Sequence, residues 1–229
     1  NQEISTNQSQ VGAGALGASF PRLASGGPTV AETGDAIRVG QGAGTVGSFT
    51  VTAQSTVDAD ATTYALSAGA VAVSANFAFV DVTPTVRAGI GDNGLLTLAG
   101  NADVRATSSG DAASQVYTLS SGVGSMGASI ASATLSPEVD ALVGVGTAMA
   151  AAGYIRVQSR HNHNGSEVLS GGGALAVANA PTNVGIGLAG NGTVPTAEAN
   201  ADVSAIVGAG STLTASGGEI AVTAPSSNL

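Results

Sequence analysis

The sequence predicts an all-β protein, a β-solenoid built from about four repeats of about 53 residues. The first observation is periodicity: Val51, Val104 and Val157 are evenly spaced by 53 residues, and Val222 follows 65 residues later. The second is that similar segments surround these valines, namely FTVTAQS, DVRATSS, IRVQSRH and IAVTAPS. The third is composition, because 34 glycines, 7 prolines and many valines disfavour helix and favour strands.

The repeats form one predicted domain, since a unit of this length without cysteine is too small to fold alone. The predicted units are 1–60, 61–113, 114–166 and 167–229. The first is expected to be atypical and cap-like, because 20–35 is rich in proline and glycine. The fourth is longer than the others, and we expect a loop insertion near 189–200.

Alternation identifies the strands within a unit. In 70–80, one parity carries Val71, Val73, Ala75, Phe77 and Phe79, which predicts a strand with one filled face. The parity of the apolar residues reverses around Pro84, which indicates a bend or a break. The sequence Gly-Asp-Asn-Gly at 91–94 predicts a tight turn, because its residues tolerate positive φ. The next strand resumes at Leu96.

Aligning the units predicts which side chains lie above one another. The inter-repeat core stack is expected to contain Val51, Val104, Val157 and Val222. Two outward pairs of opposite charge recur across the same 53-residue step, Asp103 with Arg156 and Arg87 with Asp140. Stacked units place equivalent residues about 4.8 Å apart, so each pair would attract and would favour one register. The sequence does not decide between one broad coil per repeat and two narrow coils of about 26 residues, although no half-period is visible.

Charge excludes several partners. The chain has 15 acidic residues, six arginines, no lysine and a net charge of −9, which disfavours nucleic acid and anionic membrane surfaces. The longest uncharged apolar stretch, 141–153, is too short and too rich in glycine to span a bilayer. Because the first residue is Asn1 rather than Met, we expect the chain to be processed or cut from a longer protein.

The residues do not predict an enzyme or a cofactor. The pattern G-x-G-x-x-G occurs four times at glycine-rich turns, so composition explains it, and without lysine there is no P-loop. Glu138 and Asp140 lack a convincing partner acid for catalysis. The only two histidines, His161 and His163, are interpreted as part of a solvated turn rather than a metal site. Calcium is the remaining metal, with oxygens from Asp58 and Asp60 or from Asp92 and Asn93.

Two segments resemble a known family. IGDNGLLTLAGNADVRATSS (90–109) and IVGAGSTLTASGGEIAVTAPSS (206–227) resemble the recurring strand, glycine turn and strand of giant secreted bacterial adhesins, of the filamentous haemagglutinin-like and autotransporter type. The resemblance implies a β-solenoid that is extracellular or on the bacterial cell surface and mediates adhesion or forms fibres. It implies no catalytic residue.

These observations predict a structural or adhesive extracellular protein. A stacked β-solenoid ends in unpaired backbone groups, so we expect it to form a filament by end-to-end stacking, with itself or with neighbouring repeats of a longer chain. A host receptor or glycan is a further expected partner. The alternative is a monomeric surface binding module for a glycan or a receptor, with 189–200 as its contact loop.

Overall fold

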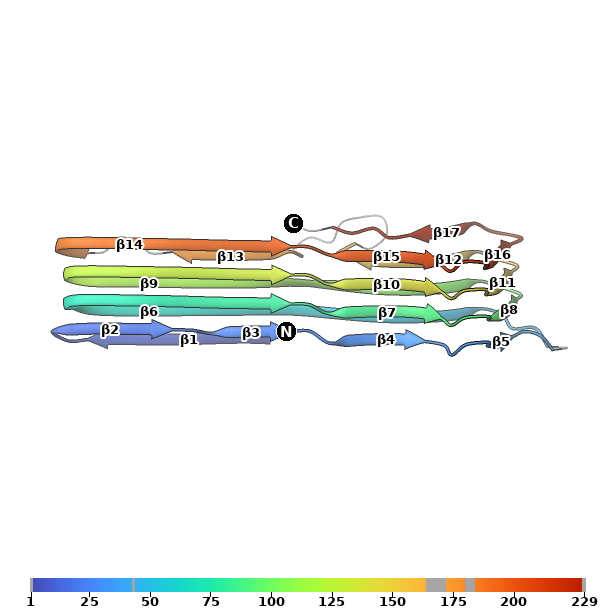
Figure 1. Ribbon diagram of the computed structural model, residues 1–229, viewed down its shortest axis with the longest axis horizontal. Helices are drawn as coiled ribbons and strands as arrows, with labels where there is room; N and C mark the ends of the chain where they lie inside the picture. Colours follow the sequence, from blue (N-terminus) through green and yellow to red (C-terminus); the bar gives the residue numbers. More distant parts are fainter. Residues whose placement is uncertain (1, 43, 164–171, 180–183, 228–229) are drawn as a thin grey trace.

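The protein is all-β, and its sheets are parallel (Figure 1). The computed structural model describes residues 2–42, 44–163, 172–179 and 184–227, with only the backbone at 184–187. In these ranges there is no helix, and therefore no helix that could cross a membrane. The strands are β1 (Gln2–Val11), β2 (Gly14–Ser19), β3 (Arg22–Ser25), β4 (Pro28–Glu32), β5 (Arg38–Val39), β6 (Phe49–Val82), β7 (Thr85–Ile90), β8 (Leu95–Leu98), β9 (Ala102–Leu135), β10 (Glu138–Val143), β11 (Ala148–Ala151), β12 (Ile155–His161), β13 (Ala174–Asn179), β14 (Val184–Ala199), β15 (Asp202–Val207), β16 (Thr212–Ala215) and β17 (Ile220–Thr223).

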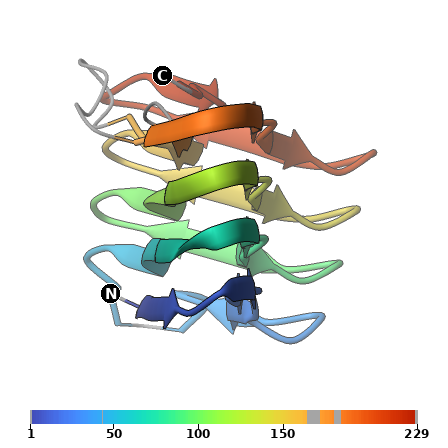
Figure 2. The same ribbon diagram turned by 90° about the vertical axis from the view of Figure 1, so that its left-hand side faces the viewer.

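The strands form three sheets in which each repeat contributes one layer. The largest has the order β1-β6-β9-β12-β17, with β2 and β3 also on β6 and with β13 and β14 also on β9. The other two have the orders β15-β10-β7-β4 and β16-β11-β8-β5. Each strand thus pairs with the equivalent strand of the next repeat, and the layers lie one above another (Figures 1 and 2).

The register shows that one repeat forms one broad layer. Every pair between β6 and β9 joins residues 53 apart, from Phe49 with Ala102 to Val82 with Leu135. Two narrow coils of about 26 residues would instead pair residues within one repeat. The shared offset also keeps buried side chains above buried side chains along the whole strand.

The strands of the first repeat pair with those of the second repeat, so the first repeat forms a further layer of the same sheets. Its strands pair with the second repeat at an offset of 57, from Gln2 with Ala59 to Val39 with Leu96. The offset falls to 52 where Val46 pairs with Leu98. The additional residues of this repeat therefore lie between Val39 and Val46.

The predicted loop near 189–200 is wrong. Residues 189–199 lie in β14 and pair continuously with 125–135 of β9. The offset instead rises from 53 at His161 to 62 at Ala174, so the additional residues lie between these two. The length of the fourth unit gives the number of added residues but not their position, and the insertion was therefore predicted too far along the chain. Residues 164–171 lie outside the described residues.

Each layer has two parts, which we call the body and the arm. In the body, three strands enclose an apolar core whose buried members include Val51, Val86, Leu96, Val104 and Met149. In the arm, the later part of β6 or β9 runs outward, turns back at its far end and returns (Figure 1). Gly69 and Gly122 lie at this reversal, where a Cβ would stand 2.0 Å from a carbonyl oxygen of the layer below. Only glycine fits such a close approach.

In the arm, the buried and the exposed face of residues 70–80 are the opposite of those expected from the sequence. Ala72, Ser74, Asn76 and Ala78 are buried, whereas Val71 is 57 % exposed. The filled face predicted from the larger side chains is therefore the outer face. The two halves of the arm enclose small side chains, and hydrogen bonds join them: Ser114 Oγ to the Ala78 carbonyl oxygen (2.7 Å), Asn76 Nδ2 to Thr118 Oγ1 (2.9 Å) and Ser74 Oγ with Ser120 Oγ (2.9 Å).

The turn at 91–94 is confirmed, and it recurs in every layer. Asn93 has a φ of 56°, and the residues above and below it, Ala36 (53°), Gly146 (67°) and Gly210 (71°), share this left-handed conformation. Asn and Gly adopt this conformation at little cost, whereas for Ala36 it is sterically strained. A common turn geometry keeps the sheets on either side of it in the same register.

Candidate functional site: the stacked columns and the open ends

The four predicted core valines form one column. The register places Val51 beside Val104, Val104 beside Val157 and Val157 beside Val222. Their exposed fractions are 8, 1, 0 and 43 %. The two inner valines are covered from both sides, whereas Val222 lies in the outermost strand, β17, and is covered only from below. The column is therefore open at its upper end.

The first predicted charge pair lies in adjacent strands. Arg156 Nη1 is 3.9 Å from Asp103 Oδ2, and Arg105 of the same strand as Asp103 is closer, with Nη2 at 2.6 Å. Asp103 thus accepts a charge-assisted hydrogen bond along its own strand and a longer contact from the layer above. Arg156 also lies over the ring of Tyr154, at 4.8 Å from the centroid, which adds a cation–π contact.

The second predicted pair is adjacent in register but is not the ion pair that Arg87 makes. Arg87 lies beside Asp140, yet its Nε is 3.0 Å from Glu32 Oε1 in the layer below. Asp140 accepts a hydrogen bond from the hydroxyl of Ser204 in the layer above. Sequence alignment missed Glu32 because it lies in the first repeat, two register positions from Arg87. Both side chains of the Arg87–Glu32 pair are exposed, so its contribution to stability is small.

Both ends of the body expose apolar core residues. At the lower end, Ala31, Ile37, Val39 and Phe49 are only partly buried. At the upper end, the same is true of the apolar side chains Val203, Ala205, Val207, Leu213 and Ala215. Over the described residues, neither end is covered by a polar capping element. Repeat proteins need such caps to stay soluble as single particles, so both ends are candidate interaction surfaces.

The ends also carry unpaired strand edges. Within the described residues, β1 to β5 have no neighbour below, and β13 to β17 have none above. Pro195 in β14 modifies the upper edge. In a parallel strand, successive residues direct their backbone amide groups alternately to the neighbour below and to the neighbour above. The N–H of Asn200 donates to the carbonyl of Leu135 below. Pro195 lies an odd number of residues before Asn200, so its nitrogen faces the open side above. Proline is tolerated there and removes one donor from that edge.

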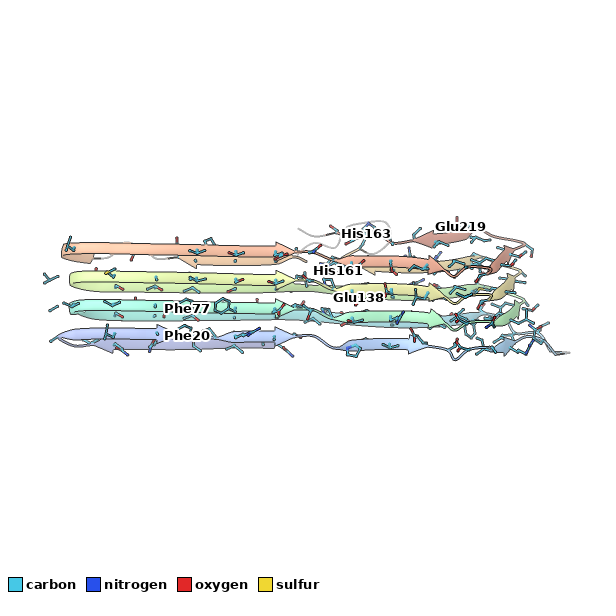
Figure 3. All side chains as sticks on the ribbon, in the orientation of Figure 1. Phe20, Phe77, Glu138, His161, His163 and Glu219 are labelled. Atoms are coloured by element: carbon cyan, nitrogen blue, oxygen red, sulfur yellow. The ribbon has the colours of Figure 1, made fainter. Side chains whose placement is uncertain are left out.

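His161 is buried, so the interpretation of the histidines as a solvated turn is wrong for this residue. His161 is 0 % exposed, and its Nε2 lies 3.1 Å from Asn162 Nδ2. Asn162 explains the burial: its Oδ1 accepts from the Gly110 N–H (3.0 Å), and its Nδ2 donates to the Gly110 carbonyl (3.1 Å). The side-chain amide satisfies both backbone groups of Gly110 where β12 leaves the sheet. Figure 3 shows His161 and His163 near this point.

Acidic side chains form a column on the outer face where the arm begins. Asp58 lies beside Asp111 in the register, and Asp60 follows on the same face. Burial, a hydrogen bond with Asp58 and the charges of Asp58 and Asp60 together raise the pKa of Asp111 to about 6, and burial contributes most. Among the described residues, no three histidine or acidic side chains are grouped so that they could hold a metal ion.

Sequence reasoning missed the apolar outer face of the arm. Columns of large side chains run across the layers there, and Phe77 stacks on Phe20 with ring centroids 4.5 Å apart (Figure 3). On the opposite face, Tyr64 stacks on Tyr117 at 5.0 Å beside a groove of about 340 Å³. The signal was available, because the alternate positions of 59–67 and 72–78 hold only Ala, Ser, Thr and Asn, which suit a thin interior.

Comparison of the chain with protein-family models, with curated proteins and with solved structures found no match in any of the three.

Proposed function

We propose that the chain is a β-solenoid segment of a secreted structural or adhesive protein, which forms or belongs to a filament by end-to-end stacking of its layers. The main support is that both ends are open, with unpaired strand edges around partly buried core residues. Such edges are templates for another strand, and a head-to-tail contact between the two different ends does not close on itself. The partner is a second copy or the neighbouring repeats of a longer chain.

Location outside the cell, on a bacterial surface, belongs to the same proposal. It is supported by the resemblance of 90–109 and 206–227 to secreted adhesins and by a composition without cysteine and lysine. The role is mechanical and non-enzymatic: parallel strands hydrogen-bonded along the stacking axis would make the fibre resistant to pulling apart layer by layer.

A monomeric binding module for a glycan or a protein receptor is the second candidate. It is favoured by the exposed apolar columns of the arm, among them Leu16 (73 % exposed), Phe20 (64 %) and Met126 (64 %). Contiguous apolar surface on a soluble protein commonly marks an interaction site. The contact surface would then be the arm, since 189–199 lies in β14 rather than in a loop.

Negative-stain electron microscopy of the purified chain over a concentration series tests the first function. We expect filaments whose width matches one layer and whose length grows with concentration. Monodisperse short particles at the highest concentration would contradict filament formation. If such particles also bind immobilised glycans or receptor protein, and Met126→Ser weakens that binding, the second function holds instead.

A further inference from the structure

We infer that two copies of the chain pair side by side through the outer face of the returning half of the arm, around a two-fold axis parallel to the stacking direction. We call this surface the pairing face. It is formed by 71–79 of β6, by 124–132 of β9, and by the residues of β2, β3 and β14 that pair with them. The pairing face lies along the side of the stack, so this inference goes beyond the end-to-end contact and does not depend on it.

The pairing face alternates large and small side chains in columns that cross the layers. The phenylalanine column contains Phe20, Phe77, Ile130 and Val194, and the rings of Phe20 and Phe77 are stacked (Figure 3). The alanine column beside it contains Ala18, Ala75, Ala128 and Gly192. The next column contains Leu16, Val73, Met126 and Gly190. A row of small side chains therefore runs through four layers between two columns of larger ones.

These three columns are exposed to solvent and carry no charge. Phe20 and Met126 are each 64 % exposed, and Val194 is 53 % exposed. The charged residues of the same face, Arg22, Asp81 and Glu198, lie beyond the phenylalanine column, toward the body. Contiguous apolar surface of this kind marks an interaction site. Each copy carries a net charge of −9, and here two copies can meet without bringing acidic side chains into contact.

The occupant is a second copy, because the columns complement themselves. A two-fold axis between the phenylalanine column and the alanine column places the phenylalanine column of each copy on the alanine column of the other. An axis in this direction keeps the layers of both copies level, so large side chains meet small ones in every layer. Packed sheets lie about 10 Å apart, and large side chains interdigitate with small ones across such a gap.

The area of the pairing face suits a pair of copies. Columns are about 6.7 Å apart and layers about 4.8 Å apart, so the three columns and one on either side cover about 600 Å² on each copy. A standard stable interface buries roughly 800 Å² per partner. Single copies should therefore pair weakly, and filaments should pair strongly, because every added copy contributes the same area.

Exchange of a large and a small side chain tests the register. In the proposed pair, Ile130 of one copy faces Ala128 of the other. Ala128→Ile therefore sets two isoleucines against each other, and it should raise the dissociation constant of the pair about tenfold or more, although it adds apolar surface. The double variant Ala128→Ile with Ile130→Ala exchanges the two columns within that layer and should restore pairing. Non-specific apolar association would instead be strengthened by Ala128→Ile alone.

Thr62→Ile is the matched control, because it adds apolar surface on the opposite face of the arm and should leave pairing unchanged. Sedimentation velocity below the concentration at which filaments form measures the dissociation constant of the pair. Electron microscopy shows whether filaments are single or paired, and circular dichroism confirms that each variant is folded.

The outcomes separate the pairing from the filament function. Pairing that Ala128→Ile leaves unchanged or strengthens, or that the double variant does not restore, would overturn the register and with it the inference. Monomers that assemble into single filaments would overturn the pairing and leave the filament function standing. Dimers without filaments would do the reverse. Monomers that bind a glycan or a receptor and lose this binding on Met126→Ser would overturn the pairing and assign this face to the second candidate function.

Discussion

At the scale of single residues, Asp111 makes the folded state sensitive to pH. Its folded pKa is raised to about 6 from an ordinary value of 3.8, chiefly by burial and by its hydrogen bond with Asp58. Between these two values the folded chain binds more protons than the unfolded chain, so this group lowers stability as pH rises through 6. Below 3.8 the carboxyl is protonated in both states and has no effect.

We therefore predict that Asp111→Asn stabilises the protein at pH 7 and leaves its stability unchanged near pH 4. The expected gain is about 1 kcal/mol, smaller than the full shift would give, because Asp111 is partly exposed and solvent screens its charge. Urea unfolding of both proteins at several pH values measures it. An equal effect of Asp111→Asn at pH 4 and pH 7 would contradict the prediction.

At the scale of the elements, the arm depends on small side chains between its two halves. Ala78 is 0 % exposed, and its carbonyl accepts a hydrogen bond from Ser114 of the facing half. We predict that Ala78→Leu destabilises the protein by about 1–3 kcal/mol, because a larger side chain would force the halves apart. Denaturant unfolding monitored by circular dichroism measures the loss.

The matched control is Ala75→Leu, three residues earlier on the outer face. Ala75 lies in the column of Ala18 and Ala128, which are both exposed, so a leucine there has room and should change stability by less than about 0.5 kcal/mol. A larger loss for Ala75→Leu than for Ala78→Leu would mean that the inner and outer faces are assigned the wrong way round.

The same strand shows where sequence reasoning succeeds and fails. Alternation located the strand at 70–80, because strand side chains point to opposite sides. It could not orient the strand, since larger apolar residues such as Phe77 and Phe79 normally face a core. In the body, where the core is wide, the same reasoning placed Val104 and Val157 inside. The difference is the thickness of the interior, which alternation does not encode.

At the scale of the whole molecule, the 53-residue period predicted the stacking because identical spacing is what continuous parallel pairing requires. It predicted neighbours in register, as for Arg87 and Asp140, but not which ion pair forms. Arg87 has acidic residues both above and below, and its long side chain reaches Glu32 instead. The position of the insertion was predicted wrongly for a related reason. The spacing between two landmarks in the sequence gives the number of added residues but not their position between the landmarks.

The open ends lead to a prediction about the stability of the chain as a whole. If each end is covered by another copy, assembly stabilises the folded state by mass action. Above the dissociation constant, a tenfold rise in protein concentration should then add about 1.4 kcal/mol and raise the melting temperature by roughly 3–5 °C. Calorimetry over a hundredfold concentration range measures this.

Val222→Pro removes a donor that faces away from β12, so it should keep the layers intact and flatten the dependence of the melting temperature on concentration. A melting temperature of the unaltered chain that stays constant over that range would show that the exposed core residues at the two ends are stable in water without a partner.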